Sequence, residues 1–256
     1  MHHSQTASRP VFLTAARRAA ASCAVACALA AGAVPASAAP PQDGYGAVRL
    51  PDSGYYRGHF AGGRMHGRGV LEWRDGARYE GGFRDGLMHG QGIHVSRSGE
   101  RYEGGFRDGM MDGRGRYRDR DGAHYEGGFA DGRFHGRGVY TGTNGERYEG
   151  EFARGALTGR GRHHDRDGLR YEGEFRDWAY HGRGVYRFAN GDRYEGGFAE
   201  GTFHGRGLIV PAAGAAGEPA LAGRWERGEF VAAEGDVAVV PDFEPLPAPV
   251  QGAESL

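Results

Sequence analysis

A tyrosine recurs every 23 residues through the middle of this chain, and this period constrains the fold more than any other feature of the sequence. A phenylalanine follows each tyrosine four residues later, and two columns of glycine keep the same period. The tyrosines and phenylalanines are Tyr56, Phe60, Tyr79, Phe83, Tyr102, Phe106, Tyr125, Phe129, Tyr148, Phe152, Tyr171, Phe175, Tyr194 and Phe198. Seven copies in one register indicate a repeat protein, in which each unit buries its apolar residues against its neighbours.

The repeat has the pattern of a β-hairpin. In a strand, alternation puts Tyr79 and Phe83 on one face and Glu80 on the other. A second short strand is expected after each Gly-x-Gly, and it is followed by an Asx-Gly pair such as Asp75-Gly76. Such a pair between strands favours a type I′ turn, which needs positive φ at both central residues. We therefore expect an all-β fold in which strand, Asx-Gly turn, aromatic strand and Gly-rich turn repeat as an elongated, single-layer, solenoid-like antiparallel sheet.

Composition agrees with many tight turns between short strands. Glycine accounts for 49 of the 256 residues, against an average usage of about 7%. Collagen is excluded, because glycine does not fall at every third position. Thirteen tyrosines and 13 phenylalanines argue against simple disorder.

The N-terminus resembles a secretory signal peptide over residues 1–38. Arginines precede an apolar run over residues 19–34, and small residues at 35–38 form a cleavage site. We expect export to the periplasm or secretion after cleavage, with an uncleaved anchor as the alternative. Residues 39–54 are then expected to be a linker.

Removal of this segment changes the chemistry that the chain can perform. Both cysteines, Cys23 and Cys27, lie within it, so the mature chain would have no disulfide, cysteine nucleophile or cysteine-based zinc site.

The mature chain would contain 29 arginines and 33 acidic residues, a net charge of −4. This balance disfavours nucleic acid and purely electrostatic membrane docking. The chain contains no lysine, which excludes P-loop and Schiff-base lysines.

The repeated unit resembles the MORN repeat family, whose motif is similar to Tyr-x-Gly-x-Trp/Phe-x-x-Gly-x-x-His-Gly-x-Gly. The resemblance covers about residues 55–210, as seven units, and is to a bacterial, exported type of protein. It implies an elongated single-layer antiparallel sheet that acts as a scaffold or module for proteins and membranes, with no catalytic residues of its own. Trp178 replaces a glycine of the sixth unit, so we expect a distorted turn there. Asp112 and Thr158 replace the histidine of the third and fifth units.

The C-terminal part departs from the repeat. A degenerate unit is visible at residues 223–228, where Trp225 takes the place of the phenylalanine. We interpret residues 211–235 as an insertion plus a capping repeat, because solenoids need atypical terminal units. Residues 236–256 are rich in proline and are expected to be disordered.

No group of residues predicts catalysis, a cofactor or a metal site. A histidine column occurs at His66, His89, His135, His181 and His204. Equivalent positions should lie about 10 Å apart, since each repeat adds two strands. Two neighbouring histidines therefore cannot share a metal ion at about 2 Å each. The acidic column that begins at Glu80 stands beside arginines and should form exposed charge pairs.

The leading hypothesis is therefore a non-enzymatic, exported scaffold that binds a protein in the cell envelope. One alternative is a lipid or membrane-surface module, and another is a regulatory module for a separately encoded enzyme. The fourteen rings of the repeat are the candidate structural residues, and any left unburied would be the contact surface. A homodimer through exposed edge strands stays open. The columns that begin at Val70 and Leu71 are both partly apolar, so the sequence leaves the buried face undecided.

Overall fold

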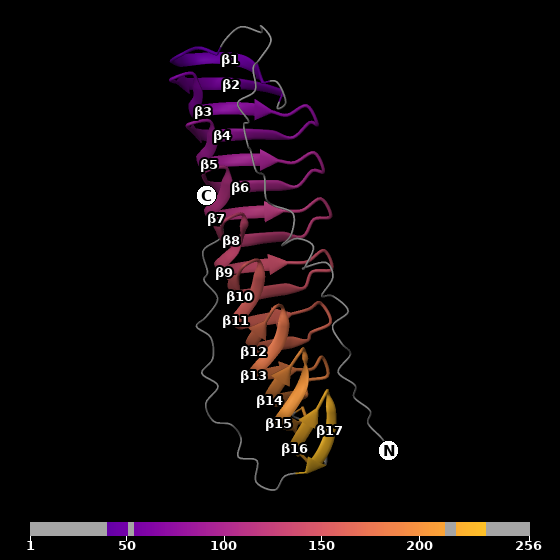
Figure 1. The fold of residues 1–256 in the computed structure, drawn as a ribbon. Coiled ribbons are helices and arrows are strands. Elements are labelled where there is room, and N and C mark those ends of the chain that lie inside the picture. The colour runs from indigo at the N-terminus through magenta and orange to yellow at the C-terminus, as the bar shows by residue number, and fades with distance from the viewer. Residues whose placement is uncertain (1–39, 51–53, 213–218, 234–256) are drawn as a thin grey trace. The chain divides into compact units, whose positions relative to one another are not determined.

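The structure is a computed structural model and describes residues 40–50, 54–212 and 219–233. Every regular element in these ranges is a β-strand, and the 17 strands belong to one open antiparallel sheet of hairpins (Figure 1). The predicted all-β hairpin repeat is confirmed. The predicted signal peptide and proline-rich tail lie outside the described residues.

The chain divides into two compact units, and the division falls within the fifth repeat. Of the described residues, we call 40–143 with 152–156 the N-unit and 144–151 with 157–233 the C-unit.

The N-unit contains nine strands, each paired antiparallel with the next. They are β1 (Gly44–Leu50), β2 (Gly54–Ala61), β3 (Arg64–Glu72), β4 (Arg78–Arg84), β5 (Leu87–Val95), β6 (Arg101–Arg107), β7 (Met110–Arg118), β8 (His124–Ala130) and β9 (Arg133–Thr141).

The remaining strands continue the same order. They are β10 (Arg147–Ala153), β11 (Ala156–His164), β12 (Arg170–Arg176), β13 (Ala179–Arg187), β14 (Arg193–Ala199), β15 (Thr202–Val210), β16 (Leu221–Glu226) and β17 (Glu229–Ala233). From β11 to β17 each strand pairs antiparallel with the next.

Each aromatic strand turns back through a two-residue loop of type I′. Asp85 and Gly86 join β4 to β5 with φ of 51° and 88°. In the sixth repeat Trp178 takes the glycine position with a φ of 70°, and its amide donates to the Leu157 carbonyl at 3.0 Å. The Gly86 amide donates to Met65 in the same way, at 2.9 Å. The expected distortion of this turn is therefore wrong, because the tryptophan adopts the left-handed conformation with its ring 6% exposed.

The Asx-Gly loop that precedes each aromatic strand has a different geometry from the one predicted. The Gly76 amide donates to the Trp73 carbonyl at 3.1 Å, and the Trp73 amide donates to the Ala77 carbonyl at 2.9 Å. Gly76 has a φ of 92°, whereas Asp75 is not among the residues with positive φ. This is a three-residue loop, in which a type I turn is followed by a left-handed glycine. The predicted type I′ turn is wrong here, since the extra loop residue allows only one left-handed position.

The His-Gly-x-Gly segment is part of a strand and not a turn. Strand β5 runs through it without interruption, although Gly90 has a φ of 73°. The pairing of β4 with β5 shifts register between Gly81 and Phe83. The segment is therefore a bulge that inserts extra residues into the longer strand.

The repeated rings pack against one another on one face of the sheet. In the N-unit, the Tyr79 ring meets the edge of Phe83 at a centroid distance of 5.1 Å and of Phe106, in the next repeat, at 4.9 Å. Edge-to-face contacts of this kind link each repeated tyrosine of the N-unit to the phenylalanine of its own repeat and to that of the next repeat. The rings thus form a continuous core within a single sheet.

Paired glycines give each tyrosine ring its place. Gly81 and Gly92 lie opposite each other in β4 and β5, and a Cβ on either would lie 2.5 or 2.4 Å from the Tyr79 hydroxyl oxygen. The same hydroxyl donates to the Gly82 carbonyl at 2.9 Å. Two glycine columns are therefore required by the close approach of the ring to the backbone.

The register also decides which apolar column is buried. Leu71 lies opposite Tyr79 and shares the ring face, where it is 1% exposed. Val70 lies opposite Glu80 and belongs to the polar face.

Strand β1 lies in the stretch that we expected to be a linker. Gly44 and Gly46 stand 23 residues before the first glycines of the repeat columns, and Gly46 lies opposite Gly58 in β2. Pro41 covers the space over Gly46 that a tyrosine ring fills elsewhere, since a Cβ there would lie 2.4 Å from Pro41 Cγ. The repeat therefore begins with a half-unit, and the glycine period extended back by one step would have found it.

Strands β16 and β17 lie in the segment that we interpreted as a capping repeat. Trp225 lies opposite Gly205, as the phenylalanine of each full repeat does, and is 5% exposed. The Gly228 amide donates to the Phe203 carbonyl at 2.9 Å, which repeats the type I′ turn contact of the other units.

Candidate functional site

The fourteen rings named from the sequence are all buried. Tyr56, Tyr79, Tyr125 and Tyr194 are fully buried, and Tyr148, the most exposed of the set, is 9% exposed. The rings therefore serve packing, and none of them provides the exposed contact surface that we considered. A further buried column on the same face was missed, although one apolar residue precedes each His-Gly position. It contains Met65, Met88, Met111, Phe134, Leu157, Tyr180 and Phe203.

The opposite face of the sheet is polar. Arg78 donates to Glu80 at 2.6 Å and Arg101 donates to Glu103 at 2.7 Å, in each case two residues along one strand. Arg116 of β7 pairs across strands with Glu126 of β8 at 3.3 Å. These exposed pairs match the charge pairs predicted from the sequence, and each contributes only a few tenths of a kcal/mol.

Several histidines of the repeated column lie on this polar face next to acids. His66 Nδ1 lies 3.9 Å from Asp85, and His89 Nδ1 lies 3.7 Å from Asp108. Among the described residues no group of three or more His, Cys, Asp or Glu side chains is arranged to hold a metal ion. No helix in the described part of the chain has the length and hydrophobicity needed to cross a membrane.

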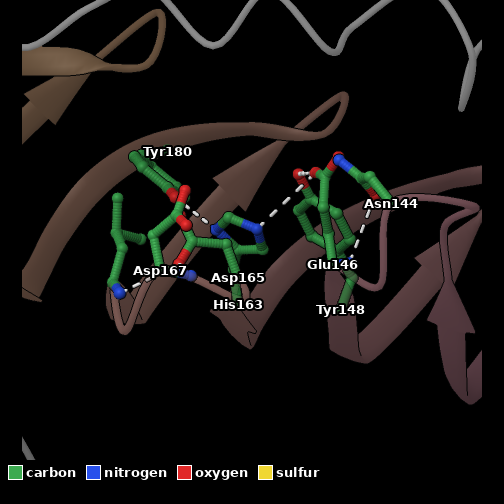
Figure 2. Close-up of polar contacts among 8 residues, drawn as sticks. Asn144, Glu146, Tyr148, His163, Asp165, Asp167 and Tyr180 are labelled. Atoms are coloured by element: carbon green, nitrogen blue, oxygen red, sulfur yellow. Dashed lines mark hydrogen bonds and ion pairs between the residues drawn. The ribbon is translucent and has the colours of Figure 1, made fainter. Parts of the chain in front are cut away.

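The ring face contains one buried polar cluster, in the C-unit (Figure 2). It consists of Glu146, Tyr148, His163 and Tyr180, with Asn144 at its edge. Glu146 and His163 are each 7% exposed, and they are the buried polar residues of the described core.

The histidine ring has a hydrogen-bond partner on one side and a carboxylate at ion-pair distance on the other. Tyr148 donates to Glu146 Oε2 at 2.9 Å, and Asn144 also donates to Glu146. His163 Nδ1 lies 2.5 Å from the Tyr180 hydroxyl, and His163 Nε2 lies 3.7 Å from Glu146 Oε2. The His163 ring stacks on Tyr148 at 4.2 Å and 15°.

The electrostatics favour a charged carboxylate beside neutral phenols. Burial raises the pKa of Glu146, but the donors His163, Asn144 and Tyr148 and the nearby imidazole outweigh burial and lower the pKa. Burial raises the pKa of Tyr180 well above its usual value. Tyr180 is therefore a neutral hydroxyl at physiological pH, able to donate to His163 Nδ1, which would leave Nε2 as the donor that faces Glu146.

The adjacent loop is a structural turn. Asp165 Oδ1 accepts hydrogen bonds from the Asp167 and Leu169 amides, each at 2.9 Å. Figure 2 shows Asp165 and Asp167 beside Tyr180, at the end of β11. These hydrogen bonds hold the end of the strand that carries His163.

Sequence reasoning missed this cluster. Each partner occupies a variable position of the repeat: the column of Glu146 also contains Ala77, Glu100 and Ala123, and the column of His163 is mostly apolar or aromatic but also contains His94. An acid and a histidine that both appear at buried columns of one repeat are the signal that could have found it.

Solved structures and a family model are similar to this chain. A solved structure of the SAS-4 (dCPAP) TCP domain in complex with a proline rich motif of Ana2 (dSTIL) of Drosophila melanogaster is similar at 11% identity and a TM-score of 0.37, and the match covers 75% of this chain and 99% of that one. No curated protein matches the sequence.

The model of the MORN repeat matches seven consecutive segments. They are residues 56–78, 79–101, 102–124, 125–147, 148–170, 171–193 and 194–210, which together make up more than half of the chain. With the tyrosine, phenylalanine and glycine columns in the places that the hairpins require, the chain belongs to the MORN repeat family.

Proposed function

We propose that this MORN repeat protein is a non-enzymatic scaffold that binds a protein partner through the polar face of its sheet. The observation that carries the proposal is the burial of all fourteen repeated rings on one face. The rings complete the core within the sheet, and the other face presents arginine and glutamate side chains at regular intervals. A repeated, exposed set of charges suits recognition of an extended partner.

We further propose that the protein acts in the cell envelope after export. The arginines, apolar run and small-residue site of residues 1–38 support this. Mass spectrometry of the protein from fractionated cells tests it: the expected N-terminus follows residue 38 in an envelope or secreted fraction. Recovery of the full-length chain from the cytosol would overturn the assignment.

Crosslinking of the full chain in its native compartment tests the scaffold function. We expect one or a few proteins to be captured in stoichiometric amounts and to bind the purified protein again in isolation. The variant Gly92→Ala, whose new Cβ should displace the Tyr79 ring, tests whether capture depends on the folded sheet. Failure of every captured protein to rebind would contradict the proposal.

A further inference from the structure

Charge is distributed unevenly between the strands and the loops of the N-unit. On its polar face, eight arginines are exposed and have no acidic partner within ion-pair distance among the described residues. They are Arg49, Arg57, Arg64, Arg68, Arg114, Arg118, Arg133 and Arg137. Many acids instead stand in the connecting turns, as Asp75, Asp85 and Asp121 do. The acidic net charge of the chain therefore does not describe this surface.

Four of these arginines gather around one strand. Arg114 and Arg118 belong to β7, Arg133 and Arg137 belong to β9, and β8 lies between them. We call these four residues the arginine patch. Strands are spaced about 4.8 Å apart, so the side chains of β7 and β9 start about 10 Å from one another. Arg114 and Arg118 are four residues apart in one strand, which is about 13 Å.

The middle strand leaves the patch open. Gly128 lies opposite Arg114 and Ala130 lies opposite Arg133, whereas His124 lies opposite Arg118. Glu126, the acid of β8 on this face, is paired with Arg116 at 3.3 Å. Small residues therefore adjoin Arg114 and Arg133, and the acid of the middle strand is already paired with Arg116.

The sixth repeat offers a contrast within the C-unit. There Glu174 takes the glycine position and lies opposite Arg160 in the register of β11 and β12. Its carboxylate accepts a hydrogen bond from the Arg183 amide at 3.2 Å. An acid thus occupies the place that is open beside Arg114, which makes the N-unit the more basic surface at this position.

We propose that the arginine patch binds an acidic segment of a partner protein in an extended conformation. Guanidinium groups bind carboxylates through paired, charge-assisted hydrogen bonds. In polyproline II geometry, a major conformer of unfolded chains, every third side chain returns to the same side after about 9 Å. An acid at every third position therefore matches the spacing between β7 and β9. This inference rests on the proposed scaffold function and names the chemistry of its partner.

Two other polyanions fit the surface less well. Single-stranded nucleic acid is usually held by aromatic rings that stack on bases, but the rings Tyr117, Tyr125 and Tyr140 of β7 to β9 are buried on the opposite face. A membrane surface would meet Glu126 within the patch, and Met110 is the exposed large apolar residue of these strands. An acidic peptide can place its carboxylates beside the arginines of the patch and avoid Glu126.

Fluorescence anisotropy of the full chain with a labelled peptide of repeating Glu-Ser-Gly triplets tests the proposal, with a Gln-Ser-Gly peptide as the uncharged control. The patch variant is Arg114→Gln with Arg137→Gln. The matched control is Arg74→Gln with Arg97→Gln, which removes the same charge from two exposed turns. We expect the patch variant to weaken binding of the acidic peptide by about tenfold and the turn variant by less than about twofold.

Three results would overturn the assignment: equal losses in both variants, absence of binding by the acidic peptide, or tighter patch-dependent binding of single-stranded DNA or of phosphatidylserine vesicles. Thermal unfolding of both variants checks that the sheet is intact. If the crosslinked partner is still captured by the patch variant at wild-type strength, the scaffold function stands and the patch is not its binding surface.

Discussion

Tyr148 donates its hydroxyl hydrogen bond to the side chain of Glu146, at 2.9 Å. The tyrosine at this position in the other six repeats donates instead to a main-chain carbonyl three residues further along. The paired glycines Gly150 and Gly161 are kept in the fifth repeat, yet Leu157 and the Phe175 ring approach them in place of Tyr148. In the fifth repeat the tyrosine ring therefore lies outside its usual site, beside both Glu146 and His163.

Glu146→Gln should destabilise the protein by about 1–3 kcal/mol at neutral pH, because it weakens the buried hydrogen bonds of a charged acceptor. The control is Glu149→Gln, which removes a half-buried acid that lies 3.4 Å from Arg147. That change should cost about 0.5 kcal/mol or less. Urea unfolding followed by tryptophan fluorescence measures the free energy of unfolding of both variants. Equal losses would show that Glu146 contributes no more to stability than Glu149 does.

The same carboxylate should make stability depend on acidic pH. Its pKa is lowered in the folded protein, so its contribution is present above the unfolded pKa of about 4.3 and is lost as the pH falls through the lower, folded value. The difference in unfolding free energy between wild type and Glu146→Gln should therefore shrink as the pH falls below about 4. A difference that stays constant down to pH 2 would contradict this.

Alkaline pH should act through the repeated tyrosines. Burial raises the pKa of Tyr56 to about 12, and it raises the pKa of Tyr79, Tyr102, Tyr125 and Tyr194 further. A raised pKa means that stability is full below the unfolded value of about 10 and is lost as the pH rises above it. We expect most of the tyrosinate absorbance to appear together with unfolding above about pH 10, because Tyr45 and Tyr55 are the exposed tyrosines among the described residues. Ionisation of most tyrosines in the folded protein would be inconsistent with these buried hydroxyls.

Gly92→Ala should be far more damaging than Gly90→Ala. A Cβ at Gly92 would lie 2.4 Å from the Tyr79 hydroxyl oxygen, whereas a Cβ at Gly90 would meet nothing within 4 Å. We expect a loss of about 2–4 kcal/mol for Gly92→Ala. Gly90→Ala should cost about 1 kcal/mol, from its φ of 73° alone. Thermal or urea unfolding compares the two, and the reverse order would exclude the ring contact as the reason for this glycine column.

Trp178→Gly should destabilise the sixth repeat although it removes a left-handed tryptophan. Relief of the φ of 70° gains about 1–2 kcal/mol. Loss of a ring that is 6% exposed and meets the edge of Tyr148 at 5.5 Å costs about 3–5 kcal/mol. The net loss should be about 1–4 kcal/mol in urea unfolding. A more stable variant would show that the ring contributes little to packing.

Much of the architecture could be predicted from local pattern. The alternation around Tyr79 and Phe83 predicts a strand, and a strict period predicts that every copy packs in the same way. The turn types could not be assigned correctly in the same manner. An Asp-Gly pair occurs in both loops of the hairpin, and only loop length, seen in the pairing of Arg84 with Leu87, distinguishes type I′ from the three-residue loop.

The candidate sites depended on relationships that a repeat motif does not contain. Glu146 and His163 are 17 residues apart, in the loop before β10 and in β11, and each occupies a variable column, so the motif predicts neither their burial nor their contact. The arginine patch was hidden by the net charge, since a sum over the chain does not separate the acids of the turns from the arginines of one face.

The sequence by itself determined the repeat, its hairpin unit and the family, because these follow from periodicity and from side chains that alternate along a strand. Only the tertiary structure decided which face is buried, since Val70 and Leu71 are both apolar and the register alone places Leu71 opposite Tyr79. It also decided that the repeated rings are core and that the arginines face outward. Burial is a property of paired strands, and a single strand read in isolation does not reveal which of its two faces its neighbours will cover.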